Sequence, residues 1–200
     1  MEEKVKISID LMGGDNSPDK TLLGIDLFVK RNKNKNDYFF YLFGDENIVK
    51  KKIRKLKYLK SNYKLFDTKI VVSNELPPLA ALKKGKGSSM WESIHSQISS
   101  KADVTLSAGN TGVLLVMSKI ILKTIDGIDR PALAGLWPND KNMNIVLDLG
   151  ANIDCSEKNL IDFSEMGSAL YRSLFHNETA KVALLNIGSE IGRASCRERV

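Results

Sequence analysis

The stretch DVTLSAGNTGVLLVMSKIILK, residues 103–123, joins a strand pattern to a longer helical pattern. Residues 103–108 are rich in apolar and β-branched side chains and predict a strand. The turn SAGNTG, residues 107–112, ends that strand, and the apolar run over residues 111–123 is long enough to predict a buried helix. A strand, a glycine turn and a helix in this order are typical of an α/β sheet.

The same alternation extends in both directions along the chain. Because several of the apolar segments lack polar alternation, we expect strands that are buried on both faces, as in a parallel sheet. Ser17 is a candidate helix cap, and Pro18 suits the first helical position. The pattern predicts a doubly wound, mainly parallel α/β sheet with no domain boundary inside residues 1–190. The further strands are expected at 5–11, 38–43, 69–73, 132–137, 144–149 and 181–187, and the further helices at 18–29, 46–60, 88–100 and 157–175.

The composition is that of a soluble globular chain. Of the 200 residues, 42% are apolar and 27% are charged, which excludes disordered and fibrous classes. No run approaches the roughly 18 apolar residues of a membrane span, and the first residues lack the apolar centre of a signal peptide, so we expect a cytoplasmic protein. Cys155 and Cys196 show no C-x-x-C spacing, so we expect no disulfide and no metal site.

The net charge of +6 is concentrated in one region. Residues 30–64 contain twelve Lys and Arg against three acidic residues, a net +9, and the other residues sum to −3. Residues 50–60 place Ile53, Leu56 and Leu59 at helical spacing, so the lysines fill the solvent side of a helix. We interpret this run as a solvated helix face without nucleic-acid binding, because no nucleic-acid-binding motif accompanies it, and a role toward an acidic partner stays open.

Small polar residues follow four of the predicted strands. Because ligands bind beyond the carboxyl ends of the strands in an open α/β sheet, these turns are expected to converge on one crevice. Glycines let the backbone approach a ligand, and N–H groups at a helix N-terminus favour an anion. The sequence therefore predicts an anion site, most clearly at SAGNTG; a glycine turn with an Asn or Asp cap is the alternative for any single turn. The four turns are 10–15, 107–112, 148–154 and 186–188.

Seven motifs, in this order and at these intervals, resemble the bacterial phosphate acyltransferase family, the acyl-ACP:phosphate acyltransferases. The resemblance covers residues 4–190 and departs from the family's usual residues at Leu11, Gly87 and Ser189. It implies a fold like that of isocitrate and isopropylmalate dehydrogenases, related to the phosphotransacylases. The motifs are IDLMGGD, GKGSSM, SAGNTG, GIDRPALAGLWP, DLGANID, FSEMGSALYR and LLNIGSE.

The resemblance implies transfer of a fatty acyl group from acyl carrier protein to inorganic phosphate, which yields an acyl phosphate for phospholipid synthesis. It also implies a homodimer, associated peripherally with the membrane, where a downstream membrane acyltransferase consumes the product; it implies no cofactor. Phosphate is itself an anionic nucleophile, so the enzyme needs to position it and to stabilise charge on the thioester oxygen. The basic run at 50–60 is suited to docking the acidic carrier protein.

Two other enzyme classes share parts of this pattern. A phosphotransacylase acting on short-chain acyl-CoA has a related fold and chemistry and remains the alternative. A nicotinamide-dependent dehydrogenase is disfavoured, because DLMGGD lacks the G-x-G-x-x-G spacing.

The site residues follow from the turns and the resemblance. Backbone N–H groups of the glycines would bind phosphate or the oxyanion, and asparagine side chains would orient the reacting groups. Arg130 would clamp phosphate or form an ion pair with Asp126 or Asp129. The substrate-binding candidates are Gly13, Gly14, Ser107, Gly109, Gly112 and Arg130, and the catalytic candidates are Asn110, Thr111, Asn152 and Asn186. Asp10, Asp15, Asp148 and Asp154 are expected first as loop anchors.

Residues 191–200, IGRASCRERV, differ in composition from the rest of the chain. They contain three Arg and no Lys, whereas residues 1–190 contain 23 Lys and 4 Arg. The segment also back-translates into a common sequencing adapter. We therefore expect a non-native read-through tail after residues 1–190, which would be the N-terminal part of a phosphate acyltransferase domain. On this interpretation the chain alone is expected to be inactive, because the crevice lacks one wall.

Overall fold

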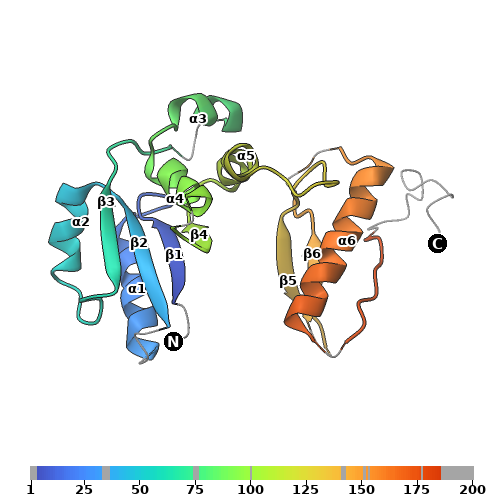
Figure 1. The fold of residues 1–200 in the computed structure, drawn as a ribbon, viewed down its shortest axis with the longest axis horizontal. Coiled ribbons are helices and arrows are strands. Elements are labelled where there is room, and N and C mark those ends of the chain that lie inside the picture. Colours follow the sequence, from blue (N-terminus) through green and yellow to red (C-terminus); the bar gives the residue numbers. More distant parts are fainter. Residues whose placement is uncertain are drawn as a thin grey trace. The chain divides into compact units, whose positions relative to one another are not determined.

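Four parallel strands form the sheet of the first of two compact units, Met1–Pro131 (Figure 1). The computed structural model describes residues 4–32, 37–73, 77–99, 101–140, 143–150, 152, 154–176 and 178–185. The strands lie in the order β3-β2-β1-β4, and all neighbouring pairs are parallel. The α/β fold predicted from the sequence is therefore confirmed. The strands are β1 (Val5–Asp10), β2 (Tyr38–Gly44), β3 (Tyr63–Asp67) and β4 (Val104–Ser107).

Helices cover both faces of this sheet. On one face, Leu22 and Ile25 of α1 (Asp19–Arg31) and Val49 of α2 (Glu46–Ile53) pack with Ile9 of β1 and Leu42 of β2. On the other face, α4 (Ser89–Ile98) contacts β1, β2 and β4. A second buried cluster joins α4 to α3 (Pro78–Lys84) and α5 (Thr111–Leu122). The helices thus leave the carboxyl ends of β1 and β4 as the place where loops can meet a ligand.

The helix predicted over residues 46–60 ends at Ile53. Asp26 of α1, which is buried, accepts hydrogen bonds from the backbone N–H groups of Lys57, Tyr58 and Leu59 at 3.4, 2.8 and 2.7 Å. These N–H groups bond to a carboxylate 31 to 33 residues away instead of to helical carbonyls. The predicted extension was wrong because a side chain on another helix holds this backbone in a loop.

The strand predicted at 69–73 was also wrong. The strand is β3, which begins and ends six residues earlier, and Ile70 forms only an isolated bridge with Ser88. Phe66 of β3 stacks on Phe43 of β2 with ring centroids 4.8 Å apart, so aromatic packing holds the earlier segment in the sheet. The short helix α3, which begins at Pro78, was not predicted.

The second unit, Ala132–Val200, contains β5 (Ala134–Pro138), β6 (Met143–Leu147) and α6 (Glu157–Leu174). The two strands pair antiparallel with each other, whereas the sequence analysis placed them in the parallel sheet. Only four residues separate them, and a parallel pair needs a crossover of about a dozen residues or more. Ser156 and Asn159 cap α6 reciprocally in a capping box.

The last predicted strand, 181–187, is not found. Residues 181–185 form no strand, and 186 and 187 lie outside the described residues. Within the part of the chain that the structure describes, no helix combines the length and the apolarity that a membrane crossing requires.

Candidate functional site

Asp10 and Ser107 are the last residues of neighbouring strands and are register partners in the sheet. The Ser107 hydroxyl donates a hydrogen bond of 2.7 Å to Asp10 Oδ2. Asp10 is 1% exposed, and its Oδ1 accepts from the backbone N–H groups of Met12 and Gly13 at 3.1 and 3.2 Å. Asp10 is therefore a loop anchor, as predicted, and it joins the turn after β1 to the turn after β4.

Glycine is required where these two turns touch. A Cβ atom on Gly13 would lie 2.4 Å from Asp10 Oδ2 and 2.8 Å from the backbone nitrogen of Gly109. Gly14 has a φ of +85°, and a Cβ atom there would lie 2.5 Å from the Ala108 carbonyl oxygen. The two predicted turns are thus brought into direct backbone contact.

Two of the N–H groups expected to bind an anion are bonded inside the turns. Gly13 donates to Asp10, and Gly109 donates to Ser107 Oγ at 3.1 Å. These bonds shape the turns, so these two N–H groups are not free to bind an anion in the way that the sequence analysis expected.

The residues that follow Gly109 form the N-terminus of α5. The side-chain oxygen of Asn110 accepts from the backbone N–H of Val113 at 3.1 Å and caps the helix. The N–H groups of Thr111 and Gly112, in the same first turn, have no acceptor within the helix. A Cβ atom on Gly112 would lie 3.2 Å from Pro78 Cγ of α3, so this turn is also closely packed. The positive end of α5 thus lies directly after the linked turns.

An apolar hollow of about 470 Å³ borders the Asp10–Ser107 pair within the first unit. Its walls come from β1, α1, β2 and β4, and Lys20 and Thr21 also line it. The site therefore combines a polar turn with an apolar space. The apolar wall residues are Ile7, Ile9, Ile25, Phe28, Phe40, Leu106 and Ala108.

Three of the predicted site residues do not belong to these turns. Asn152 belongs to the second unit, where its backbone N–H and its side-chain amide both donate to Asp148 Oδ1, at 3.2 and 3.0 Å. Asp148 is therefore also a loop anchor. The turn at 148–154 follows β6 of a separate sheet, so it does not share the sheet edge of the first two turns. Arg130 is exposed between α5 and β5, and Asn186 lies outside the described residues.

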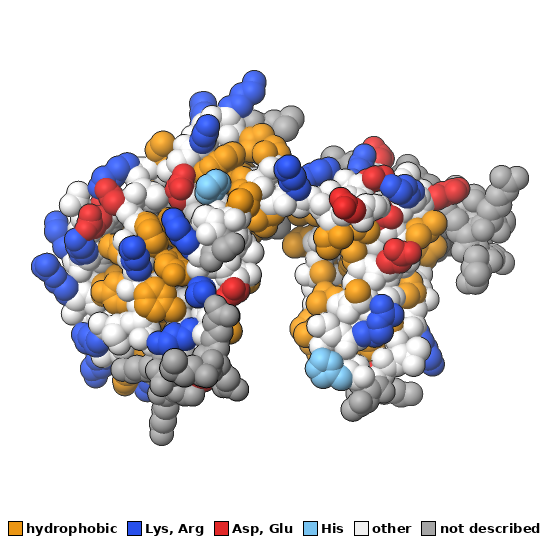
Figure 2. Space-filling model, viewed as in Figure 1, with side chains coloured by type: hydrophobic (Ala, Val, Ile, Leu, Met, Phe, Trp, Pro, Cys, Tyr) orange, Lys and Arg blue, Asp and Glu red, His pale blue; other side chains and the backbone are white. Residues whose placement is uncertain are grey.

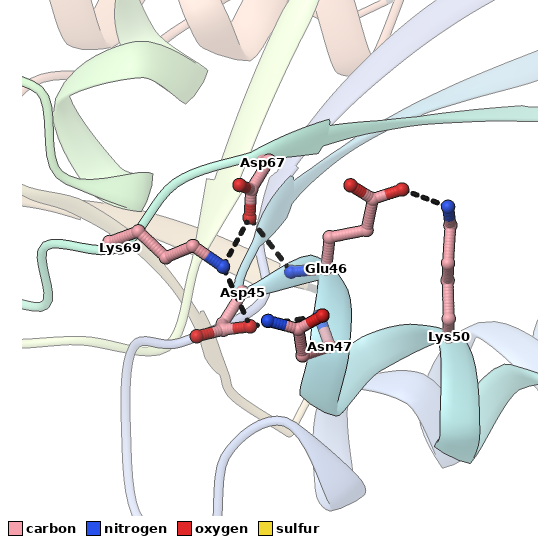
Figure 3. Close-up of polar contacts among 6 residues, drawn as sticks. All are labelled: Asp45, Glu46, Asn47, Lys50, Asp67 and Lys69. Carbon is pink, nitrogen blue, oxygen red and sulfur yellow. Dashed lines mark hydrogen bonds and ion pairs between the residues drawn. The ribbon is translucent and has the colours of Figure 1, made fainter.

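A charged cluster that the sequence analysis missed lies at the carboxyl ends of β2 and β3 (Figure 3). The Lys69 ammonium lies 3.2 Å from Asp45 and 3.1 Å from Asp67, and Asp67 accepts from the Glu46 backbone N–H at 2.9 Å. The hydrogen bond from Lys69 lowers the pKa of Asp45, and the Glu46 N–H, together with Lys69, lowers the pKa of Asp67. Both carboxylates raise the pKa of Lys69. This cluster holds the start of α2 against β3, and Lys69 partly compensates the charge of the two carboxylates.

Comparison with known proteins gives a family match over almost the whole chain. A family model described as "Fatty acid synthesis protein" matches residues 5–196. The chain is 53% identical over 190 residues to a phosphate acyltransferase of Pelagibacter ubique (strain HTCC1062) and 42% identical over 187 residues to one of Rhizobium meliloti (strain 1021). These alignments cover 95% and 93% of this chain but 56% and 53% of the relatives, so the chain spans about half their length.

A solved structure shares the fold. The EutD phosphotransacetylase from Staphylococcus aureus matches with a TM-score of 0.58 at 19% sequence identity, over 86% of this chain and 54% of that chain. The expected relation to the phosphotransacylase fold is confirmed.

Proposed function

The chain belongs to the family described as "Fatty acid synthesis protein" and is similar to phosphate acyltransferases, and we propose that the protein transfers a fatty acyl group to inorganic phosphate. The proposed donor is the thioester of acyl carrier protein, and the product is an acyl phosphate for phospholipid synthesis. The observation that carries the proposal is the N-terminus of α5, directly after two backbone turns that Asp10 and Ser107 lock together.

The proposed phosphate site is the first turn of α5. The N–H groups of Thr111 and Gly112 donate to phosphate oxygens, and the helix dipole favours the negative charge. The linked turns keep these donors in place before phosphate arrives, which lowers the cost of ordering them on binding. Gly13, Gly14, Ser107 and Gly109 then act by shaping the turns.

The reaction needs no protein nucleophile. A phosphate oxygen attacks the thioester carbonyl carbon, the C–S bond breaks, and the carrier leaves as a thiol once its sulfur takes a proton. The enzyme positions phosphate and stabilises the oxyanion that forms on the carbonyl oxygen. In this proposal the side chains of Asn110 and Thr111 contact phosphate or the oxyanion. Asn152 and Asn186 orient the acyl carbonyl or phosphate, and Arg130 clamps phosphate.

The apolar hollow beside Ser107 and Ala108 supports a long acyl chain over an acetyl or butyryl group. An experiment separates these donors: the full-length protein is assayed for acyl phosphate formation with acyl carrier protein thioesters and with short-chain acyl-CoA. We expect turnover with the carrier thioesters. Turnover only with short-chain acyl-CoA would replace this proposal with a phosphotransacylase.

The assembly and location are proposed on the same family resemblance. We propose a cytoplasmic homodimer, associated peripherally with the membrane, where a downstream membrane acyltransferase uses the acyl phosphate. Size-exclusion chromatography with light scattering tests the dimer, and flotation with liposomes tests the association. We also propose that residues 1–200 expressed alone do not turn over, and the same assay tests this.

A further inference from the structure

A shallow hollow of about 320 Å³ lies on the solvent side of α2 and the turn that follows it. Its lining contains Ile48, Lys51, Lys52 and Lys55, at the spacing i, i+3, i+4 and i+7, which places these side chains on one face. The opposite face of the helix is fixed in the core by Val49 and Ile53, which are 0% and 6% exposed. The lysine face is therefore held toward solvent by the packing of α2.

The charge of this face is only partly compensated. Lys50 pairs with Glu46, and Lys52 lies 2.6 Å from Asp19 of α1. Four further exposed cations take part in no ion pair with the residues that the structure describes: Lys51, Arg54, Lys55 and Lys57. Lys and Arg side chains gather over the α2 side of the first unit in Figure 2. The face therefore attracts an acidic surface.

The backbone of the face is preformed. Asp26 fixes residues 57–59 from α1, and the Lys52–Asp19 pair ties α2 to the same helix. Ile48 is 40% exposed at the N-terminal end of this face, one helical turn before Lys51 and Lys52, so an apolar side chain of a partner can contact it. An apolar contact beside exposed charges resembles the core and rim of a protein interface.

The position of the face connects it to the candidate site. α2 begins directly after β2, whose carboxyl end lies beside that of β1 in the sheet, where Asp10 pairs with Phe43. Ile48 is in the first turn of α2, about one helical turn from that edge. A partner seated on α2 thus lies close to the sheet edge that carries the proposed phosphate site.

We propose that this face, which we call the α2 lysine face, docks an acidic protein surface whose carboxylates pair with Lys51 and Lys55 and whose apolar side chain contacts Ile48. The identity of the partner rests on the proposed function: it is the acidic carrier protein that delivers the acyl group. A protein surface is favoured over a membrane, because residues 46–60 contain a single aromatic side chain, Tyr58, whereas membrane-surface helices present an apolar face with several such anchors.

The test is charge reversal in the full-length protein. Lys51→Glu with Lys55→Glu removes the two pairing cations, and Lys83→Glu with Lys84→Glu on α3 makes the same change of net charge at another exposed lysine pair. Binding of the carrier protein is measured by calorimetry at low and moderate salt, and thermal unfolding is measured to show that each variant is folded. We expect the α2 variant to weaken binding by about tenfold or more at low salt, while the α3 variant stays near wild type.

Kinetics give a second readout. We expect the α2 variant to raise KM for the acyl carrier thioester and to leave kcat and KM for phosphate unchanged. Equal binding of the carrier protein by wild type and the α2 variant would overturn the docking proposal. Binding to anionic vesicles is measured as well, and a charge reversal that abolishes vesicle binding but leaves carrier binding unchanged would also overturn it. Failure of the proposed function has a different signature, because the wild-type protein would then form no acyl phosphate from acyl carrier protein thioesters, while the binding measurement still reports on the α2 lysine face.

Discussion

Ser107 donates a hydrogen bond of 2.7 Å to Asp10, a residue 97 positions earlier in the chain, and so connects the two turns of the candidate site. Ser107 Oγ also accepts from the Gly109 N–H, so one hydroxyl serves both turns. The geometry of SAGNTG therefore depends on a carboxylate at the end of β1.

Replacing Ser107 tests this connection. Ser107→Ala removes a partner of the buried Asp10 carboxylate and the acceptor of the Gly109 N–H, and we expect a loss of about 1 to 3 kcal/mol in the free energy of unfolding. Chemical denaturation measures the loss. Ser99→Ala removes a hydroxyl that bonds only locally to the Ser96 carbonyl and is the matched control. Equal stability of the two variants would show that the link does not hold the turns.

The close packing at Gly13 predicts that alanine costs more stability at Gly13 than at Gly109. A methyl group on Gly13 meets Asp10 and the Gly109 backbone, whereas one on Gly109 meets Met90 Cε, the flexible end of a side chain. We expect Gly13→Ala to cost about 1 to 3 kcal/mol of folding stability and Gly109→Ala to cost less. Gly24→Ala, where the space is open within α1, should stabilise by about 0.5 to 1 kcal/mol. A Gly13→Ala variant as stable as wild type would contradict the packing.

Asn110 has two roles that substitutions separate. Asn110→Ala removes the cap of α5 and should cost about 1 kcal/mol of stability. Asn110→Asp keeps the acceptor for Val113 N–H but adds a negative charge beside phosphate. We expect both variants to lose activity, on the order of 2 to 4 kcal/mol of transition-state stabilisation, with Asn110→Asp near wild type in stability. Steady-state kinetics with phosphate as the varied substrate measures this, and wild-type kcat/KM in both variants would remove Asn110 from the site.

The charged cluster at α2 predicts a pH dependence. Asp45 and Asp67 have pKa values below their ordinary 3.8, so their contribution to stability is fully present above that pH and is lost as the pH falls through the lowered values. Lys69 has a pKa raised above its ordinary 10.5, so its contribution to stability is fully present below that pH and is lost as the pH rises through the raised value. We expect the stability difference between wild type and Lys69→Met to be larger at neutral pH than near about pH 3. A difference that does not vary with pH would contradict the assignment.

The sequence predicted the helices and strands that follow from a local pattern of apolar residues. It missed the boundaries that depend on side chains distant in the sequence. β1, β2, β4, α1, α4, α5 and α6 lie where apolar periodicity placed them. The predicted cap of α1 was wrong, because the Ser17 hydroxyl donates to the Gly13 and Gly14 carbonyl oxygens and Pro18 stands at the N-cap without a side-chain bond. The end of α2 depends on Asp26 of another helix, and β3 depends on the stacking of Phe66 on Phe43, so neither is visible in a local window.

The same distinction holds for the site. The glycines and Asp10 were identified as turn residues from their order after the strands, and close packing confirms the need for glycine at Gly13 and Gly14. The N–H groups of Gly13 and Gly109 bond locally to the side chains of Asp10 and Ser107, whereas the Ser107–Asp10 bond between the turns depends on the register of β1 against β4 and was not predicted. With those two N–H groups occupied, the proposed anion contacts are the N–H groups of Thr111 and Gly112.

The most direct test of phosphate binding at α5 is an amide NMR titration of the full-length protein with inorganic phosphate at constant ionic strength. We expect saturable shifts of the Thr111 and Gly112 amide resonances, while the amides at the start of α6, Glu157 and Lys158, stay unchanged. Unchanged Thr111 and Gly112 resonances, or equal shifts at both helix N-termini, would contradict phosphate binding at α5.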